Sequence, residues 1–195
     1  MQVVFTKHAN QNYSVVVTKG DRIKLQFQGV GKKFLIPHDI SHFIVESKLD
    51  ISQGFWGCVA DGVLFPSINV MGGCQQPNAK SKNKQVVKAA NRQLRLAECL
   101  VRIFDEIHTV KSEDVILSLA RNHLQEISAD ILPSNLLDTT IVDICSTFRA
   151  SQVSWQAMDI KESIEIDWNQ NLPSKSKSKI FFESATKQES NRSKF

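Results

Sequence analysis

The chain lacks the features that mark secreted and membrane-spanning proteins. Its four cysteines, Cys58, Cys74, Cys99 and Cys145, form no C-x-x-C pair, which argues against a zinc knuckle and a thioredoxin-like redox site. No run approaches the roughly eighteen apolar residues of a transmembrane helix. Residues 1–7 lack the basic and apolar segments of a signal peptide. We therefore expect a cytoplasmic protein with reduced thiols and no membrane contact.

The signatures of several common enzyme classes are also missing. The sequence contains no G-x-S-x-G nucleophile motif, no Walker phosphate loop and no dinucleotide-binding fingerprint. Residues 29–33 hold two glycines followed by two lysines, but the spacing of a phosphate loop is absent. We interpret this segment as a turn.

The composition is that of an ordinary globular protein. Of 195 residues, 42% are hydrophobic and 23% are charged. The net charge of +4 permits an acidic partner without requiring one. Serine and lysine alternate over residues 174–179, and the chain stays polar and basic to its end. The sequence therefore predicts one domain over residues 1–171 and a basic, disordered tail over residues 172–195.

The first thirty residues have the pattern of β-strands. Residues 3–7, 13–18 and 22–28 are rich in Val, Ile, Phe, Tyr and Thr, and turn-forming residues separate them. Apolar and polar side chains alternate over residues 23–27, as expected for a strand with one buried face. A late segment, residues 163–168, alternates in the same way. We predict a three-stranded antiparallel meander, with the late strand pairing against it.

The middle of the chain has the apolar periodicity of helices, which predicts an α+β fold: a small antiparallel sheet packed with four to five helices. Residues 66–83, rich in Gly, Pro, Asn and Ser, are expected to form a loop. We predict five helices. The first begins at Pro37, and the second begins near residue 51, where residues 50–53 have the spacing of a capping box. The third and fourth span about 84–107 and about 112–127, and the fifth begins at residues 133–134.

The richest chemical motif is His38-Asp39-Ile40-Ser41-His42, followed by Glu46. It contains two of the five histidines, and their spacing of four residues places both imidazoles on one face of a helix. Such a pair suits a divalent metal or an acid–base site. His38 and Glu46 stand about 12 Å apart along a helix axis, so one ion cannot bind both directly. The candidates for a further ligand are Glu98, Asp105, Glu106, His108 and His123.

From this motif we predict a site with two kinds of residue. His38 and His42 are the predicted ligands of a divalent metal such as zinc, and Asp39 and Glu46 are the predicted catalytic carboxylates, with hydrolysis as a candidate reaction. The alternative is that these residues have only structural roles. Histidine pairs at this spacing also arise by chance, and Asp39 has a sufficient role in complementing the helix dipole.

Two resemblances accompany the motif. His38-Asp39-x-x-His42 resembles the zincin motif H-E-x-x-H, which implies zinc on the two histidines and a general base at Asp39, although aspartate is one methylene shorter than glutamate. Residues 34–57 resemble a group of small uncharacterised bacterial proteins that carry H-D-x-x-H-x-x-V-E, then an aromatic, glycine-containing segment. That resemblance implies that the block acts as a unit and implies no activity.

A competing hypothesis concerns the predicted helix over residues 84–107. Lys84, Lys88, Arg92 and Arg95 fall near one face of it, where they would contact the phosphates of nucleic acid or another acidic partner. No aromatic residues for base stacking lie nearby, which counts against single-stranded ligands. On this reading the protein is a non-catalytic interaction protein, and the basic tail assists the helix. A solvated face opposite an apolar seam is the plainer explanation.

Overall fold

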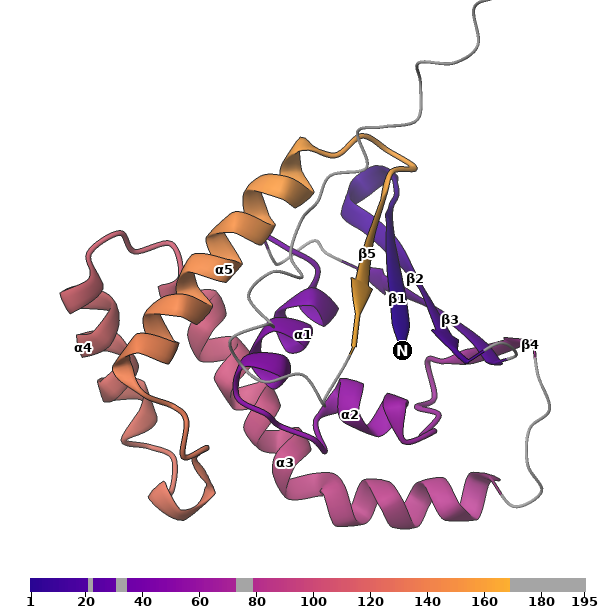
Figure 1. The fold of residues 1–195 in the computed structure, drawn as a ribbon, viewed down its shortest axis with the longest axis horizontal. Helices are drawn as coiled ribbons and strands as arrows, with labels where there is room; N and C mark the ends of the chain where they lie inside the picture. The colour runs from indigo at the N-terminus through magenta and orange to yellow at the C-terminus, as the bar shows by residue number, and fades with distance from the viewer. Residues whose placement is uncertain (21–22, 31–34, 73–78, 169–195) are drawn as a thin grey trace, which may run out of the picture.

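The computed structural model describes residues 1–20, 23–30, 35–72 and 79–168 (Figure 1). The predicted tail over residues 172–195 lies outside this part of the chain, as does most of the turn predicted at residues 29–33. Within the described residues, no helix has the length and apolar character needed to cross a membrane.

A five-stranded antiparallel sheet forms one layer, with the strand order β4-β3-β2-β1-β5. The predicted meander is confirmed, and the late strand pairs with β1, with Val3 opposite Ile166. The strands are β1 (Gln2–Lys7), β2 (Asn12–Lys19), β3 (Ile23–Val30), β4 (Asn69–Gly72) and β5 (Ser163–Asp167).

Strand β4 corrects the prediction of a continuous loop over residues 66–83. Three of its four residues have partners on β3: Asn69 lies opposite Gln26, Val70 opposite Leu25 and Gly72 opposite Lys24, with a shift in register between the last two pairs. A strand this short carries too few residues to show an alternating pattern. Its pairing with β3 is a tertiary interaction that local composition does not reveal.

One face of the sheet carries the core. The alternate residues Val3, Phe5, Val15, Leu25 and Phe27 are all buried, whereas Val4 and Gln26, which lie between two of them, are half-buried. This is the expected outcome of a period-two pattern in an antiparallel sheet with one solvated face.

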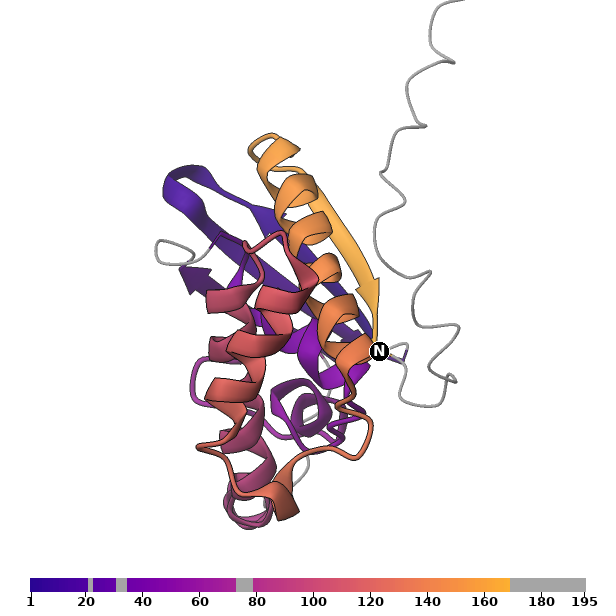
Figure 2. The same cartoon turned by 90° about the vertical axis from the view of Figure 1, so that its left-hand side faces the viewer.

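Five helices gather on the apolar side of the sheet (Figure 1), which confirms the α+β class. Seen with the helical side toward the viewer, α4 and α5 lie in front of the sheet (Figure 2). The helices are α1 (His38–Lys48), α2 (Phe55–Ala60), α3 (Ala79–Ile107), α4 (Glu113–Leu124) and α5 (Asp138–Ala157), with two short 3-10 turns at Ala9–Gln11 and Ala129–Ile131.

Three predicted helix boundaries were wrong. The second helix begins at Phe55 rather than near residue 51, because Asp50 adopts a left-handed conformation (φ 54°) and the Gln53 N–H donates to the Gln93 side chain. Helix α3 begins at Ala79, inside the predicted loop. Helix α5 begins at Asp138, because a turn in which Leu136 N–H donates to the Pro133 carbonyl comes first.

Helix α4 begins at Glu113 as predicted and ends at Leu124, three residues short of the expected end near 127. Ser112 occupies its N-cap position, but its side chain makes no capping hydrogen bond. The apolar helical stretches around Cys99 and Cys145 indicate thiols in the core, and the structure buries Cys145 but leaves Cys99 half-buried.

Helix α1 runs through the middle of the molecule, and every residue from Ile40 to Glu46 is buried. Its apolar side chains join the core that the sheet, α3 and α5 share. Buried polar groups are costly unless they are hydrogen-bonded. The polar residues His42 and Glu46 of α1 therefore need partners from neighbouring elements, and these partners build the site.

Candidate metal site

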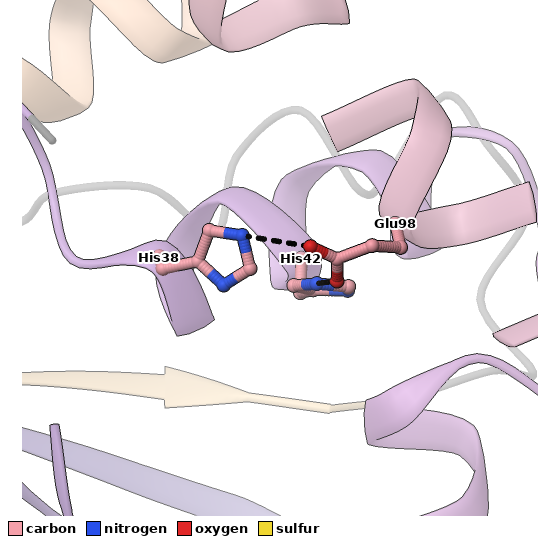
Figure 3. Close-up of side chains that lie close together, drawn as sticks. All are labelled: His38, His42 and Glu98. Carbon is pink, nitrogen blue, oxygen red and sulfur yellow. Dashed lines mark hydrogen bonds and ion pairs between the residues drawn. The ribbon is translucent and has the colours of Figure 1, made fainter. Parts of the chain in front are cut away.

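The two predicted metal ligands lie side by side on α1. His38 is the first residue of the helix and His42 lies one turn later, so both rings project from the same face (Figure 3). Their centroids are 4.8 Å apart and their planes meet at 71°. The predicted geometry of the histidine pair is confirmed.

Glu98 of α3 completes the group. One carboxylate oxygen lies 2.9 Å from His42 Nε2, and the other lies 3.5 Å from His38 Nε2. The three ligand atoms of the group lie within 4.8 Å of one another. Glu98 was one of five sequence candidates for the further ligand. Of the others, His108 donates its Nδ1–H to the Phe104 carbonyl, and His123 faces Glu106 at 3.8 Å.

Glu46 supports the site from its buried side and links α1 to α2. Its carboxylate is fully buried and accepts hydrogen bonds from the backbone N–H groups of Phe55 (2.8 Å) and Trp56 (2.9 Å), at the start of α2. Gly54 makes this approach feasible, since a Cβ atom there would come within 2.3 Å of the carboxylate carbon. The two halves of the segment 34–57 are thus joined through one buried side chain.

His42 lies between two carboxylates. Its Nδ1 is 3.0 Å from Glu46 and its Nε2 is 2.9 Å from Glu98. An imidazolium donates at both nitrogens, so the charged ring satisfies both acceptors. Burial works against this charge, but the hydrogen bonds that His42 donates to both carboxylates outweigh it and raise the pKa of His42 to about 9. In the absence of metal, His42 is protonated at neutral pH.

The pKa values of His38 and Glu98 are both lowered, which is the direction that metal binding requires of a histidine and a carboxylate. Burial and the neighbouring His42 cation lower the pKa of His38, which favours its neutral, metal-binding form. The hydrogen bond from His42 is the main cause that lowers the pKa of Glu98. A metal ion would displace only the proton on His42 Nε2.

Asp39 faces away from these ligands, toward the sheet. Its carboxylate accepts a hydrogen bond from the Tyr13 hydroxyl of β2 at 2.5 Å, and its backbone carbonyl accepts one from the Trp56 indole. Burial raises the pKa of Asp39. Tyr13 was not identified from the sequence. The packing of its ring on Gly29, where a Cβ atom would come within 2.0 Å, is a contact across two strands and has no local signal.

The ligands therefore meet between two helices. The sheet reaches the polar network of α1 through Tyr13 of β2, whose hydroxyl donates to Asp39. The three side chains differ in their exposure to solvent: that of His42 is 8% exposed, that of His38 is 26% exposed and that of Glu98 is 61% exposed. The exposed edge of the site lies on the α3 side.

Two histidines and one carboxylate suit a divalent metal. This set occurs in catalytic zinc sites, where a fourth position is left for water, and in non-haem iron(II) sites. Ligand atoms about 2 Å from a tetrahedral zinc ion would stand about 3.3 Å apart. In the structure the three ligand atoms, one from each residue, lie within 4.8 Å of one another, so the side chains would have to move slightly closer together around a bound ion.

The basic residues of the competing hypothesis lie on α3. Lys84, Lys88, Arg92 and Arg95 are all exposed. Arg92 makes an ion pair with Asp130. Binding of nucleic acid through these residues stays a prediction, as do the catalytic roles predicted for Asp39 and Glu46.

Comparisons with known proteins gave no relative: no family model, no curated protein and no solved structure matches this chain. The chemistry of the site must therefore be inferred from its own geometry.

Proposed function

We propose that the chain binds one divalent metal ion, with zinc as the first candidate, through His38 Nε2, His42 Nε2 and the carboxylate of Glu98. Three protein ligands leave a coordination position for water, and bound zinc lowers the pKa of such a water to about 7. We propose a hydrolytic reaction on this basis. The graded exposure of the ligands supports it, since a substrate can reach the exposed edge of the site.

The observation that carries the proposal is the contact between Glu46 and His42. Metal-binding histidines commonly donate their second N–H to a carboxylate, which fixes the ring and strengthens the ligand. Glu46 holds Nδ1 of His42 at 3.0 Å and is itself held by the α2 backbone. Nε2 of His42 is thereby directed toward Glu98, beside His38.

The test is metal analysis of the purified chain after equilibration with zinc. We expect one zinc ion per chain in the wild type and loss of this ion in the His38→Ala/His42→Gln double variant. His123→Gln, which removes a histidine outside the group, is the matched control and should retain the metal. Circular dichroism establishes that each variant is folded. Absence of stoichiometric zinc, cobalt or iron in the folded wild type would overturn the proposal.

The hydrolytic part is tested separately with an activated nitrophenyl ester and a nitrophenyl phosphate. We expect zinc-dependent turnover of at least one of them that the Glu98→Gln variant loses. Zinc binding without turnover of either compound would reject the hydrolytic activity and leave the metal site in place.

Binding of nucleic acid is a second proposal, favoured by the exposure of Lys84 and Lys88, which make no ion pair in the part of the chain that the structure describes. It concerns α3 and does not depend on the metal site.

A further inference from the structure

The arginines of the described residues divide into two groups. Three of the five have an acceptor within the chain: Arg92 pairs with Asp130, Arg121 pairs with Asp138, and Arg149 donates to the backbone carbonyls of His108 and Val110. The other two, Arg95 and Arg102, are exposed and make no ion pair or hydrogen bond in the described part of the chain.

Both of these arginines lie next to the metal-site carboxylate. Arg95 precedes Glu98 by three residues and Arg102 follows it by four, and these are the spacings at which helix side chains are neighbours. At about 100° per residue, both lie roughly 40–60° around α3 from Glu98, to the same side. The charge of Arg102 contributes to the lowered pKa of Glu98, which agrees with this proximity.

We propose that Arg95 and Arg102 bind an oxyanion group of the substrate, whose remaining oxygen coordinates the metal held by His38, His42 and Glu98. This inference rests on the proposed function. Guanidinium groups bind phosphate and carboxylate through paired N–H donors, so an arginine without an internal acceptor has this capacity available. A cation beside a metal also stabilises negative charge that develops on a bound phosphate or acyl group.

The placement of the two arginines favours this role over a structural one. They are exposed neighbours, along α3, of the most exposed ligand of the group, so their guanidinium groups and the Glu98 carboxylate are open to solvent together. The buried wall of the site already holds the carboxylate of Glu46, which would repel a second anion there. A negatively charged substrate is therefore expected to approach the site beside Arg95 and Arg102.

Cobalt-loaded protein provides the test, because the visible spectrum of bound cobalt(II) reports on its ligands. Inorganic phosphate and acetate are titrated separately into wild type, into Arg95→Gln/Arg102→Gln, and into Arg121→Gln as a matched control. We expect at least one anion to change the spectrum saturably, with affinity reduced about tenfold or more in the double variant and unchanged in the control. The anion with the tighter arginine-dependent binding identifies the class.

The outcomes separate the two proposals. If the wild type binds no cobalt, the metal site and the anion site both fail. If cobalt binds stoichiometrically to wild type and double variant, but neither anion changes the spectrum or both bind the two proteins equally, the anion site alone is overturned. Equal cobalt stoichiometry in all three proteins shows that the arginines do not act through the metal ligands.

Discussion

The carboxylate of Glu46 lies against Gly54, with its two oxygens 2.5 and 2.6 Å from the place where a Cβ atom would stand. Real Cβ atoms do not approach other atoms this closely. The contact lets the Phe55 and Trp56 amides reach the carboxylate, and the carboxylate in turn holds His42. One glycine thus permits the buried hydrogen bonds that hold His42 beside His38 and Glu98.

We predict that Gly54→Ala lowers the free energy of unfolding by about 3 kcal/mol, because the added methyl group displaces the buried carboxylate from its donors. Gly20→Ala is the control. Gly20 has open space around it but a φ of +57°, so that change costs only about 1 kcal/mol of backbone strain. Urea denaturation measures both values. An equal decrease in the free energy of unfolding in the two variants would show that an added methyl group at residue 54 does not disturb the contact with Glu46.

Glu46→Gln should weaken zinc binding while leaving all three ligands in place. Loss of a carboxylate partner behind a ligating histidine typically reduces metal affinity about 10–100-fold. Competition with a chromogenic chelator measures the affinity. The exposed Glu126→Gln is the control. Unchanged affinity in folded Glu46→Gln would mean that this carboxylate only supports the fold.

The metal-free protein should lose stability as the pH rises from about 6.5 to about 9. The pKa of His42 is raised from 6.5 to about 9 in the folded state, so its stabilising charge is fully present below pH 6.5 and disappears as the pH passes 9. The change amounts to about 3 kcal/mol at most. Urea denaturation at a series of pH values measures it, and His42→Gln should flatten the profile in this window. An equally steep profile in that variant would assign the effect to another group.

Tyr13 is the only tyrosine in the chain, so a phenolate signal in ultraviolet absorbance can be assigned to this residue. Burial first, and then the charge of Asp39, raise its pKa above the ordinary value of 10. We expect no phenolate signal on raising the pH until the protein unfolds, with absorbance and circular dichroism changing together. In urea, the same residue should titrate near 10. Ionisation of Tyr13 in the folded protein would contradict its buried hydrogen bond.

Retention on immobilised nucleic acid tests the basic residues of α3. If they contact phosphates, retention falls with salt and the Lys84→Ala/Lys88→Ala/Arg92→Ala variant is retained less. Most of the loss should come from the two lysines, because Arg92 is already paired with Asp130. The control replaces the exposed Lys24, Lys111 and Lys161, which removes the same charge elsewhere. Equal retention of the two triple variants would reject α3 as the contact.

Local pattern predicted much of the fold. The strands of the meander and the late strand follow from alternation, and α1 follows from Pro37 and the apolar spacing after it. The predictions failed where contacts between distant parts of the chain determine the local structure. Strand β4 exists because β3 offers an edge, and the start of α2 is set by the carboxylate of Glu46 rather than by the capping box at residues 50–53.

The sequence by itself determined that His38 and His42 share a helix face, because an α-helix returns to the same side every 3.6 residues. It could not select Glu98, which lies 56 residues beyond His42, nor assign Glu46 to the α2 amides. Those contacts arise only when α1 packs against α2 and α3. Packing of distant elements depends on the shape of the whole core, and no spacing within a single element encodes it.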